Sequence, residues 1–362
     1  MKNALERARA EIDRIDTEMA RLFSERMQAA KEIAAYKQET GMRLFDPQRE
    51  AQVIEKGAAR VEDAVVRSYY VNFLHALMDL SKAYQGRLSE GMRVAFSGTT
   101  GAFAEVASRK IFPDAALCPF PDFEAAYRAV EEGRCDVAVL PLENSTNGAV
   151  GTVMDLAFFG SLSLNGIYDV EIEQNLLAKP GTPLSAIRTV ISHPQALGQC
   201  ADYIKAHGFK AEEFSNTAVA AKHVADTKDK SIAAIGAREA AERFGLTVLD
   251  HDINSQRNNT TRFAVFSRTS NAGNDNSKSL HSILLFTVRN EAGSLAKALD
   301  VIGSFGFNMR TLRSRPMKEL LWEYYFYVET EGNIQTERGR CMLEELSTFC
   351  DKLKFAGTYK KF

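Results

Sequence analysis

Apolar side chains in the N-terminal segment recur at intervals of three and four residues. The positions are Ile12, Ile15, Met19, Leu22, Ala29 and Ile33. This spacing predicts one long helix that ends before Gly41 and buries a single apolar face. Arg26 falls on that face, and Lys37, further along the helix, lies about 20° away around its axis. An unpaired buried charge costs several kcal/mol, so either acidic side chains or a bound anion must neutralise the two cations.

Two shorter helices are predicted to follow. Asp46 before Pro47 has the residue types of a helix N-cap and of a first helical position. The third helix is expected over residues 62–85, with inward-facing apolar side chains at Phe73, Leu77 and Leu80. Because two shorter helices cannot cover the long one, we expect residues 1–90 to form an all-helical domain that packs against a second copy. A homodimer or a higher homo-oligomer follows.

The pattern changes after a predicted hinge at residues 86–91. Short β-type runs then alternate with helical segments, in RVAFSG, DVAVLP, RTVISHP, SIAAIGA and TRFAVFS. This alternation is typical of an α/β sheet, and it defines a second domain over residues 92–268. A polar linker over residues 267–279 leads to a third domain over residues 280–362. Its order of strand, helix, strand, strand, helix and strand is typical of an α+β sandwich of the ferredoxin-like type.

Composition narrows the classes of function. Hydrophobic residues make up 45%, charged residues 25%, and the net charge is −2, so no basic surface points to nucleic acid. No stretch approaches the ~18 apolar residues of a membrane span, and the charged N-terminus is unlike a signal peptide, so no membrane contact is expected. Five scattered cysteines without CxxC spacing predict a cytoplasmic protein with neither a disulfide nor a zinc site.

Polar side chains in the helical domain are spaced so that they share helix faces. Asp46, Arg49 and Glu50 lie at i, i+3 and i, i+4 on one helix, and Ser81 and Gln85 lie at i, i+4 on the next. Each also has a purely structural interpretation. Asp46 would cap a helix, Arg49 would form a surface ion pair, Gln85 would be a solvated helix end, and Glu50 would neutralise the two cations of the first helix.

Residues 1–88 resemble the helical class of chorismate mutase, on the residues Arg9, Arg26, Lys37, Asp46-Pro47-Gln48-Arg49-Glu50, Ser81 and Gln85. Arg9 points about 100° away from Arg26, which fits an arginine that reaches across a dimer. The resemblance implies that Arg9 and Arg26 hold the carboxylates of chorismate. Lys37 and Gln85 would donate to the ether oxygen whose bond breaks. It further implies Glu50 and Asp46 as partners of the ring hydroxyl and of Arg49, Ser81 as a substrate contact, and no cofactor or metal.

Four polar islands mark the ends of strands and the starts of helices in the α/β domain. They are PLENSTNG, SHPQALGQC, SNTAVAAK and NNTTRF. In open α/β sheets, loops at strand ends form the ligand crevice, and helix N-termini there bind anions. A single island is more often a capped turn, but four in one domain favour a site.

These islands resemble prephenate dehydratase over about residues 92–267, through the patterns ENS, SHPQAL-x-QC, TA-x-AAK and TRF. The resemblance implies two lobes around a cleft, as in periplasmic binding proteins. The substrate would be prephenate, which loses carbon dioxide and hydroxide and therefore needs an acid for the leaving group. Thr261 is implied to interact with that hydroxyl, and Glu143 is implied as a second catalytic residue. The other residues implied to line the cleft are Asn144, Ser145, Ser192, His193, Gln195, Thr217 and Arg262.

Three features of this domain leave alternatives open. His193 has the character either of a general acid or of a helix cap. The glycine loop reads Gly98-Thr99-Thr100-Gly101-Ala102-Phe103-Ala104, where the family pattern is Gly-Pro-x-Gly-Thr-Phe-Ser. Thr99 and Thr100 are the hydroxyls available in place of those that are missing, and Asn216 stands where serine is usual. No acidic residue follows the loop at the distance that a dinucleotide site requires.

Residues 280–362 resemble an ACT regulatory domain. In this enzyme family that domain binds phenylalanine through a Gly-Ala-Leu turn and a Glu-Ser-Arg-Pro turn. The corresponding runs here are Gly293-Ser294-Leu295 and Arg313-Ser314-Arg315-Pro316. Phenylalanine is therefore the implied effector, bound by Gly293, Ser294, Leu295, Ser314 and Arg315. Arg313 replaces a glutamate and reverses the charge at that position.

Together the three resemblances predict a multidomain enzyme of phenylalanine synthesis with mutase and dehydratase activities. One rival hypothesis is a sensor of carboxylates or amino acids that catalyses nothing. Thr261, Glu143 and Lys37 argue against it, because a sensor does not need all three. Another rival is an enzyme that keeps only the mutase activity, since the glycine loop is altered.

Overall fold

The structure is a computed structural model that describes residues 2–40, 47–256, 258–270, 279–317 and 323–360. The chain divides into two compact units, Met1–Arg93 and Val94–Phe362. No helix in these ranges combines the length and the apolar content needed to cross a membrane.

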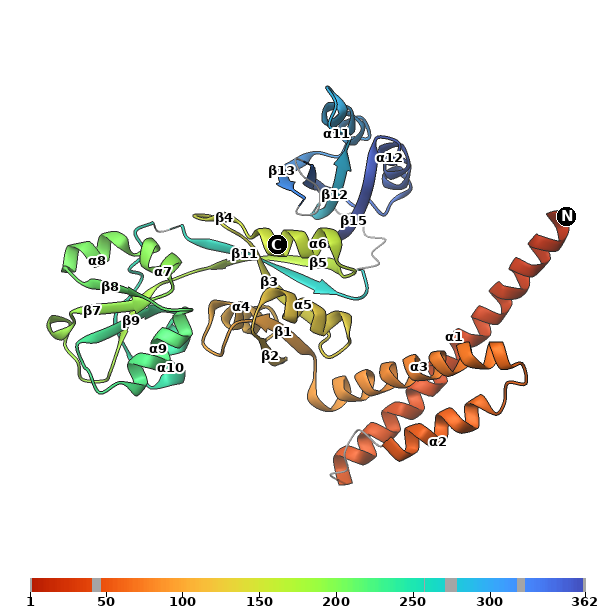
Figure 1. Cartoon of the computed structure of the whole chain (residues 1–362), viewed down its shortest axis with the longest axis horizontal. Helices are drawn as coiled ribbons and strands as arrows, with labels where there is room; N and C mark the ends of the chain where they lie inside the picture. The colour runs from red at the N-terminus through yellow and green to blue at the C-terminus, as the bar shows by residue number, and fades with distance from the viewer. Residues whose placement is uncertain (1, 41–46, 257, 271–278, 318–322, 361–362) are drawn as a thin grey trace. The chain divides into compact units, whose positions relative to one another are not determined.

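The described residues of the first unit form three helices, and in Figure 1 the second runs beside the third while the first crosses the third and extends beyond it. They are α1 (Lys2–Thr40), α2 (Pro47–Ala58) and α3 (Ala64–Glu90). The first ends where the sequence predicts, and the carboxylate of Asp63 caps the third by accepting from the amides of Val65 and Val66 at 2.8 and 2.9 Å. The predicted hinge is wrong over most of its length, because α3 continues through Glu90 and only Gly91, with φ of 80°, leaves the helix. The predicted cap residue Asp46 lies outside the described residues.

The apolar stripe of α1 is exposed within the single chain, and its predicted burial against a second copy stays a prediction. Ile12, Met19 and Ile33 are 57%, 46% and 49% exposed. The side of α1 that packs on α3 carries Ala30 and Ala34, which are both buried. Small side chains let the two helices approach closely. The larger apolar residues of α1 lie on another side of the helix and stay exposed.

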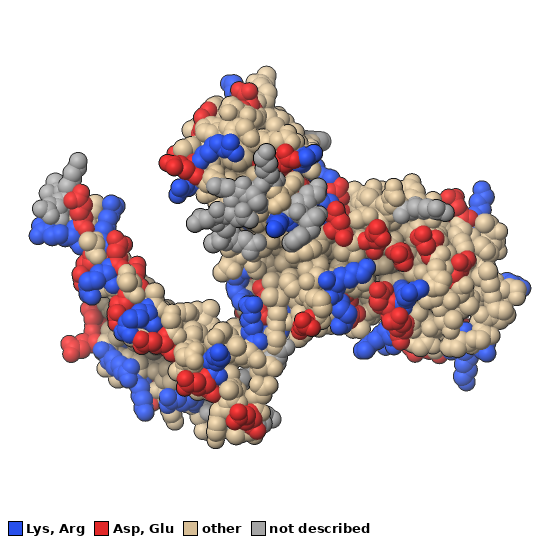
Figure 2. Space-filling view, turned by 180° about the vertical axis from the view of Figure 1, so that it is seen from behind, with Lys and Arg blue, Asp and Glu red and all other residues tan. Residues whose placement is uncertain are grey.

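The apolar side chains of α3 also differ from the prediction. Phe73 and Leu80, expected to face inward, are 43% and 51% exposed, whereas Leu74 and Met78 are buried. The surface of the helical unit otherwise mixes acidic and basic side chains (Figure 2), including the i, i+3 pair of Glu11 and Arg14 at 2.7 Å.

The second unit begins with two α/β lobes, each built on its own sheet (Figure 1). The first lobe has the strand order β2-β1-β3-β11-β5, with β4 beside β3. Its elements are β1 (Arg93–Ser97), α4 (Phe103–Ile111), β2 (Ala116–Phe120), α5 (Phe123–Glu131), β3 (Val137–Asn144), β4 (Gly148–Ala149), α6 (Gly151–Phe159), β5 (Ser163–Glu171) and β11 (Thr260–Ser267). The chain thus leaves this lobe after β5 and returns to its centre with β11.

The second lobe has the strand order β10-β6-β9-β7-β8. Its elements are β6 (Asn175–Ala178), η1 (Leu184–Ala186), β7 (Thr189–Ser192), α7 (Pro194–Gln199), α8 (Ala201–His207), β8 (Lys210–Glu213), α9 (Thr217–Asp226), β9 (Ile232–Gly236), α10 (Arg238–Phe244) and β10 (Thr247–Asp250). Ile235 packs with α7 and α8, while its neighbour Ala234 packs with α9 and α10. Both faces of the sheet are therefore covered, as a continuous apolar run such as SIAAIGA requires.

The C-terminal part follows the predicted order of elements. It contains β12 (Leu280–Val288), α11 (Ser294–Ser304), β13 (Met309–Pro316), β14 (Tyr324–Glu331), α12 (Glu337–Ser347) and β15 (Cys350–Lys360). The strands form one antiparallel sheet in the order β13-β14-β12-β15. Leu284 and Phe286 pack with the two helices, whereas Ile283 and Leu285 face the first lobe.

One hydrophobic core joins the C-terminal sheet to the first lobe. Tyr325 stacks on Phe158 of α6 with ring centroids 4.4 Å apart and an interplanar angle of 11°. Strand β15 passes directly over β5 at Gly357, whose φ is 151° and where a Cβ atom would overlap the carbonyl oxygen of Leu164. Glycine is required at this crossing both by the backbone conformation and by the space available.

Gly357→Ala is expected to destabilise the second unit by about 2–4 kcal/mol, because the two sheets must separate or the backbone must strain. Thermal unfolding followed by circular dichroism measures the effect. Gly208→Ala is the matched control, since Gly208 has φ of 66° at a helix end with nothing within 4 Å, and about 1 kcal/mol is expected there. Equal melting temperatures for the two variants would contradict the close approach.

Candidate functional site

A cavity of about 600 Å³ lies between the two lobes. One wall comes from the loops and strands of the first lobe, and the other from the starts of α7 and α9. The structure brings together here five residues predicted from the sequence: Asn144, His193, Gln195, Thr217 and Thr261. Polar islands from distant parts of the chain therefore meet in one cleft.

Asn144 and Thr261 form the centre of the first wall. They face each other as cross-strand neighbours on β3 and β11. The Asn144 side-chain amide donates to Thr261 Oγ1 at 3.0 Å and to Asn259 Oδ1 at 2.8 Å. Asn144 and Thr261 are only 6% and 7% exposed, so the pair is held in a largely desolvated environment.

The hydrogen-bond pattern fixes the direction of the Thr261 hydroxyl. Asn144 Oδ1 accepts from the amides of Thr146 and Asn147, both at 3.0 Å, which orients the side-chain amide toward Thr261. Because Thr261 Oγ1 accepts from that amide, its own hydrogen is left to donate. Among the described residues that hydroxyl donates to no acceptor, and it lines the cavity. It can therefore donate to an oxygen atom of a bound molecule.

The second wall is made of capped helix starts. The imidazole Nδ1 of His193 accepts from the backbone amide of Gln195 at 3.2 Å, so His193 caps α7. Asn216 caps α9 by accepting from the Val219 amide at 2.7 Å. Asparagine thus does the capping at the position where the family usually has serine.

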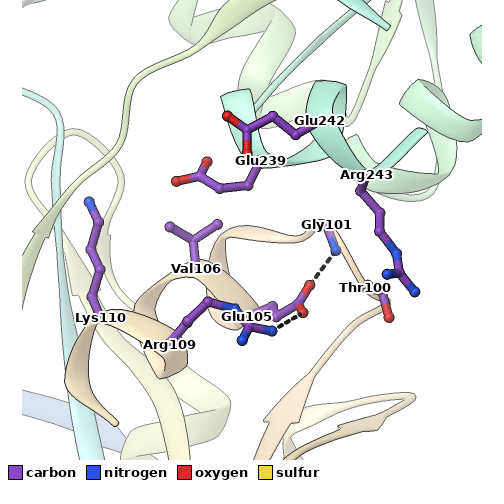
Figure 3. A pocket seen from close by; sticks show the side chains of 9 residues that line it. All are labelled: Thr100, Gly101, Glu105, Val106, Arg109, Lys110, Glu239, Glu242 and Arg243. Atoms are coloured by element: carbon purple, nitrogen blue, oxygen red, sulfur yellow. Dashed lines mark hydrogen bonds and ion pairs between the residues drawn. The ribbon is translucent and has the colours of Figure 1, made fainter. Parts of the chain in front are cut away.

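The glycine loop separates this cleft from a second hollow of about 520 Å³ (Figure 3). Gly98 and Ala102 face the cleft, whereas Thr100 faces the second hollow. Figure 3 shows the hollow between α4, which carries Arg109 and Lys110, and α10, which carries Glu239 and Glu242. Thr100 therefore does not supply the cleft with one of the hydroxyls that the loop lacks.

Glu143 and Arg262, predicted to line the cleft, lie on its reverse side. Side chains alternate along a strand, so β3 and β11 present Asn144 and Thr261 to the cavity and Glu143 and Arg262 to the C-terminal sheet. Arg262 binds the Glu329 carboxylate at 3.1 Å, and Glu143 binds the guanidinium of Arg313. The prediction that these two side chains line the cleft is wrong, because it treated neighbours along a strand as facing the same way.

Ser145 and Ser192 support the walls rather than line them. The hydroxyl of Ser145 donates to the Asn258 carbonyl at 2.7 Å and accepts from the Thr260 amide at 3.0 Å. Ser192 is fully buried and donates to the Ile235 carbonyl at 2.6 Å. Both hydroxyls bond to backbone groups, which is the structural role of a turn or a strand end.

Gln174 is a cleft residue that sequence reasoning missed. It is 2% exposed, its Nε2 donates to Gln199 Oε1 at 3.1 Å, and its own Oε1 has no hydrogen-bond partner among the described residues. An acceptor left unpaired in a buried position is a group to explain by function or by an ordered water. No motif surrounds Gln174, so only its burial beside the cavity reveals it.

The helical unit holds a second group of predicted residues. The guanidinium of Arg26 donates to the hydroxyl of Ser81, which links α1 to α3 as the predicted shared site requires. Burial lowers the pKa of Arg26, and among the described residues no carboxylate neutralises it. The structural alternative in which Glu50 pairs with Arg26 is wrong, because Glu50 binds Lys82 at 3.0 Å.

The remaining predicted residues of this unit lie as follows. Lys37 and Gln85 are half-buried, on the same helices as Arg26 and Ser81. Arg9 and Arg49 are exposed. Lys82 was not foreseen, although it follows Ser81 directly and brings a further cation to this part of α3.

Comparisons with known proteins match both units of the chain to known families. A family model of chorismate mutase type II matches residues 8–86, and one of prephenate dehydratase matches residues 94–271. The bifunctional chorismate mutase/prephenate dehydratase of Neisseria gonorrhoeae is 33% identical over 353 residues, covering 96% of this chain and 94% of that protein. That of Escherichia coli K12 is 30% identical over 376 residues, covering 99% and 96%. This chain belongs to the bifunctional chorismate mutase/prephenate dehydratase family.

As a member of this family the chain is an enzyme with a mutase domain and a dehydratase domain. Solved structures resemble its dehydratase and C-terminal parts. A prephenate dehydratase from Arthrobacter aurescens in complex with L-Phe is 28% identical with a TM-score of 0.68, covering 75% of this chain and 90% of that one. GqqA, described as a novel type of quorum quenching acylase, is 30% identical with a TM-score of 0.69, covering 75% and 98%.

The predicted effector residues lie on two elements of the C-terminal sheet domain. Gly293, with φ of 85°, precedes α11, and Ser294 and Leu295 are its half-buried first residues. On β13, Ser314 is exposed, while Arg315 binds Asp155 of α6 at 3.1 Å. In this structure the side chain of Arg315 therefore forms an ion pair with the dehydratase domain.

Proposed function

We propose that the chain rearranges chorismate to prephenate in its helical unit and converts prephenate to phenylpyruvate in the cleft. The Asn144–Thr261 pair carries this proposal, since it aims a hydroxyl donor into a cavity between two lobes. The two reactions follow from family membership. The side chains in each unit account for the chemistry of its reaction.

For the first reaction, chorismate is a dicarboxylate whose rearrangement needs a held conformation rather than a nucleophile. Arg26 suits a substrate carboxylate, because its partner Ser81 is neutral and its charge is available. Lys37 and Gln85 donate to the ether oxygen as its bond to carbon breaks and negative charge develops there. Glu50 and Asp46 are the partners of the ring hydroxyl and of Arg49. Arg9 is contributed to the site by a second copy of the chain.

For the second reaction, the bond between the ring and its carboxylate breaks and carbon dioxide leaves. The electron pair of that bond makes the ring aromatic, and the ring hydroxyl departs as water once it receives a proton. Thr261 donates a hydrogen bond to that oxygen as negative charge builds on it. His193, as a helix cap with Nδ1 occupied, orients the second wall together with Gln195 and Thr217.

We infer three domains with boundaries at residues 1–90, 92–268 and 280–362, the last of them an ACT domain. The order of its elements and of its strands supports this assignment. The relative from Arthrobacter aurescens in complex with L-Phe supports phenylalanine as an effector that lowers dehydratase activity. Gly293, Ser294, Leu295, Ser314 and Arg315 are the residues proposed to bind it.

A second copy of the helical unit is proposed to cover the apolar stripes of α1 and α3. The exposed side chains are Leu5, Ile12, Ile15, Met19, Leu22, Phe23, Ile33, Val65, Tyr69, Phe73 and Leu80. Contiguous apolar surface of this kind marks an association site. Such a dimer also gives exposed Arg9 a site in which to act.

Lys37→Ala is expected to lower mutase turnover by about 100-fold or more and to leave prephenate conversion intact, because a different unit performs it. Thr261→Ala is expected to do the reverse, with a loss of about 100-fold or more. Absorbance of chorismate and of phenylpyruvate reports each step separately.

Two variants serve as controls for this separation. Lys31→Ala removes an exposed lysine from the same helix, and Thr261→Ser keeps the hydroxyl. Wild-type enzyme that consumes chorismate but accumulates prephenate would overturn the dehydratase half and leave an enzyme with mutase activity alone.

L-Phenylalanine is expected to lower the rate of phenylpyruvate formation progressively as it is titrated into the enzyme. The reason is that ligand binding at the C-terminal domain must favour one arrangement of the second unit over another. D-Phenylalanine is the control for specific recognition. A flat L-phenylalanine curve would refute the effector assignment.

Leu22→Asp is expected to dissociate the dimer and abolish mutase activity, since it places a charge on the apolar stripe of α1. Analytical ultracentrifugation measures the change in mass. Lys31→Asp places the same carboxylate about 180° around the helix and should leave the dimer intact. A wild-type protein that sediments as a monomer contradicts the proposal directly.

A further inference from the structure

The cleft and the C-terminal sheet share two strands. On β3 and β11, Asn144 pairs with Thr261 and Glu143 pairs with Arg262 in the strand register. The first pair faces the cavity and the second faces away from it, so each cleft residue is joined by one peptide bond to a charged residue behind it. A displacement of the backbone at Glu143 or Arg262 therefore also moves Asn144 or Thr261.

All four strands of the C-terminal sheet contribute a side chain to the charged pair behind the cleft. Arg313 of β13 binds Glu143, and Glu329 of β14 binds Arg262 at 3.1 Å. Tyr359 of β15 accepts from Arg262 at 3.2 Å and donates to Glu329 at 2.5 Å. His281 of β12 lies 3.2 Å from the Glu329 carboxylate.

The part of this network around Glu329 is buried, whereas the Arg313–Glu143 pair is partly exposed. Glu329, Tyr359 and His281 are 2%, 1% and 5% exposed. Burial alone would raise the pKa of Glu329, but hydrogen bonds from Arg262 and Tyr359 overcome it, so the carboxylate stays charged. Removing one partner of a buried ion pair leaves an uncompensated charge, and the surrounding groups must rearrange.

We propose that Arg313 and Glu329 are positioning residues for the dehydratase reaction, acting through Glu143 and Arg262 to set the Asn144–Thr261 pair. This inference rests on the proposed function of the cleft. It assigns a role to Arg313, the residue that reverses the family's usual charge. The C-terminal sheet thus forms the back wall of the active site as well as carrying the effector residues.

A second ion pair between the C-terminal sheet and the first lobe serves as a comparison. It shows whether the Arg313 ion pair positions the cleft residues or only holds the two parts together. Arg315 binds Asp155 on helix α6, away from β3 and β11. Both ion pairs hold the C-terminal sheet to the first lobe, but only that of Arg313 lies directly behind cleft residues.

The test is a double-mutant cycle on the full-length enzyme with prephenate as substrate. Arg313→Gln and Glu143→Gln are each expected to lower kcat by about 10- to 100-fold, with KM changed less than threefold, because the reacting groups are misplaced rather than lost. The double variant should be no slower than the slower single variant, since both remove one interaction. Arg313→Lys, which keeps the charge, should recover at least half of the wild-type kcat.

Asp155→Asn is the matched control and should lower the melting temperature while leaving kcat unchanged. Thermal unfolding followed by circular dichroism reports for every variant whether the second unit is folded, while mutase turnover reports only on the helical unit. Additive losses in the double variant, or a wild-type kcat in Arg313→Gln, would overturn the inference while the cleft keeps its function. A wild-type enzyme without prephenate turnover would instead overturn the proposed function, and this inference with it.

Discussion

Strands β3 and β11 each present one side chain to the cleft and the next to the C-terminal sheet. This alternation is the constraint on which the second unit depends. It joins a pair of hydrogen-bonded polar residues, Asn144 and Thr261, to an ion pair, Glu143 and Arg262, through the same backbone. The polar pair is nearly desolvated, and behind it Glu143 and Arg262 form ion pairs with Arg313 and with buried Glu329. A sheet with solvent on its reverse side would leave those strands freer to move.

The two catalytic units meet the demands of their reactions by different means. The cleft is complete within one chain, because two lobes bring capped helix starts opposite strand ends. The helical unit leaves large apolar stripes exposed and keeps Arg26 beside a neutral hydroxyl. Half-buried Arg26, which binds no carboxylate among the described residues, suits an anionic substrate, and the exposed stripes suit association with a second copy. The walls of the cleft are positioned by packing within the chain, whereas the helical unit is the part for which we propose packing between copies.

Several features were predictable because they follow from local rules. Proline after a cap residue, apolar periodicity and short β-branched runs located α1, α2, β1, β3, β7, β9 and β11. Other strands gave no such signal. Strand β8 is exposed along its whole length and reads as polar sequence, and Gln174 is buried without belonging to any motif. Hydrophobic patterns along a sequence indicate which apolar residues are buried. They therefore do not predict polar strands at a sheet edge or polar side chains in the interior.

By itself the sequence determined the order of the secondary-structure elements in the C-terminal part and the five cleft residues that its motifs mark, namely Asn144, His193, Gln195, Thr217 and Thr261, because residue type and spacing along the chain are sufficient for these. Only the tertiary structure decided which way the side chains face. It turned the apolar stripe of α1 outward, since Ala30 and Ala34 pack on α3 instead. It also placed Glu143 and Arg262 against the C-terminal sheet. The physical reason is that a side chain's environment is set by whatever packs on its face, and those partners come from distant parts of the chain.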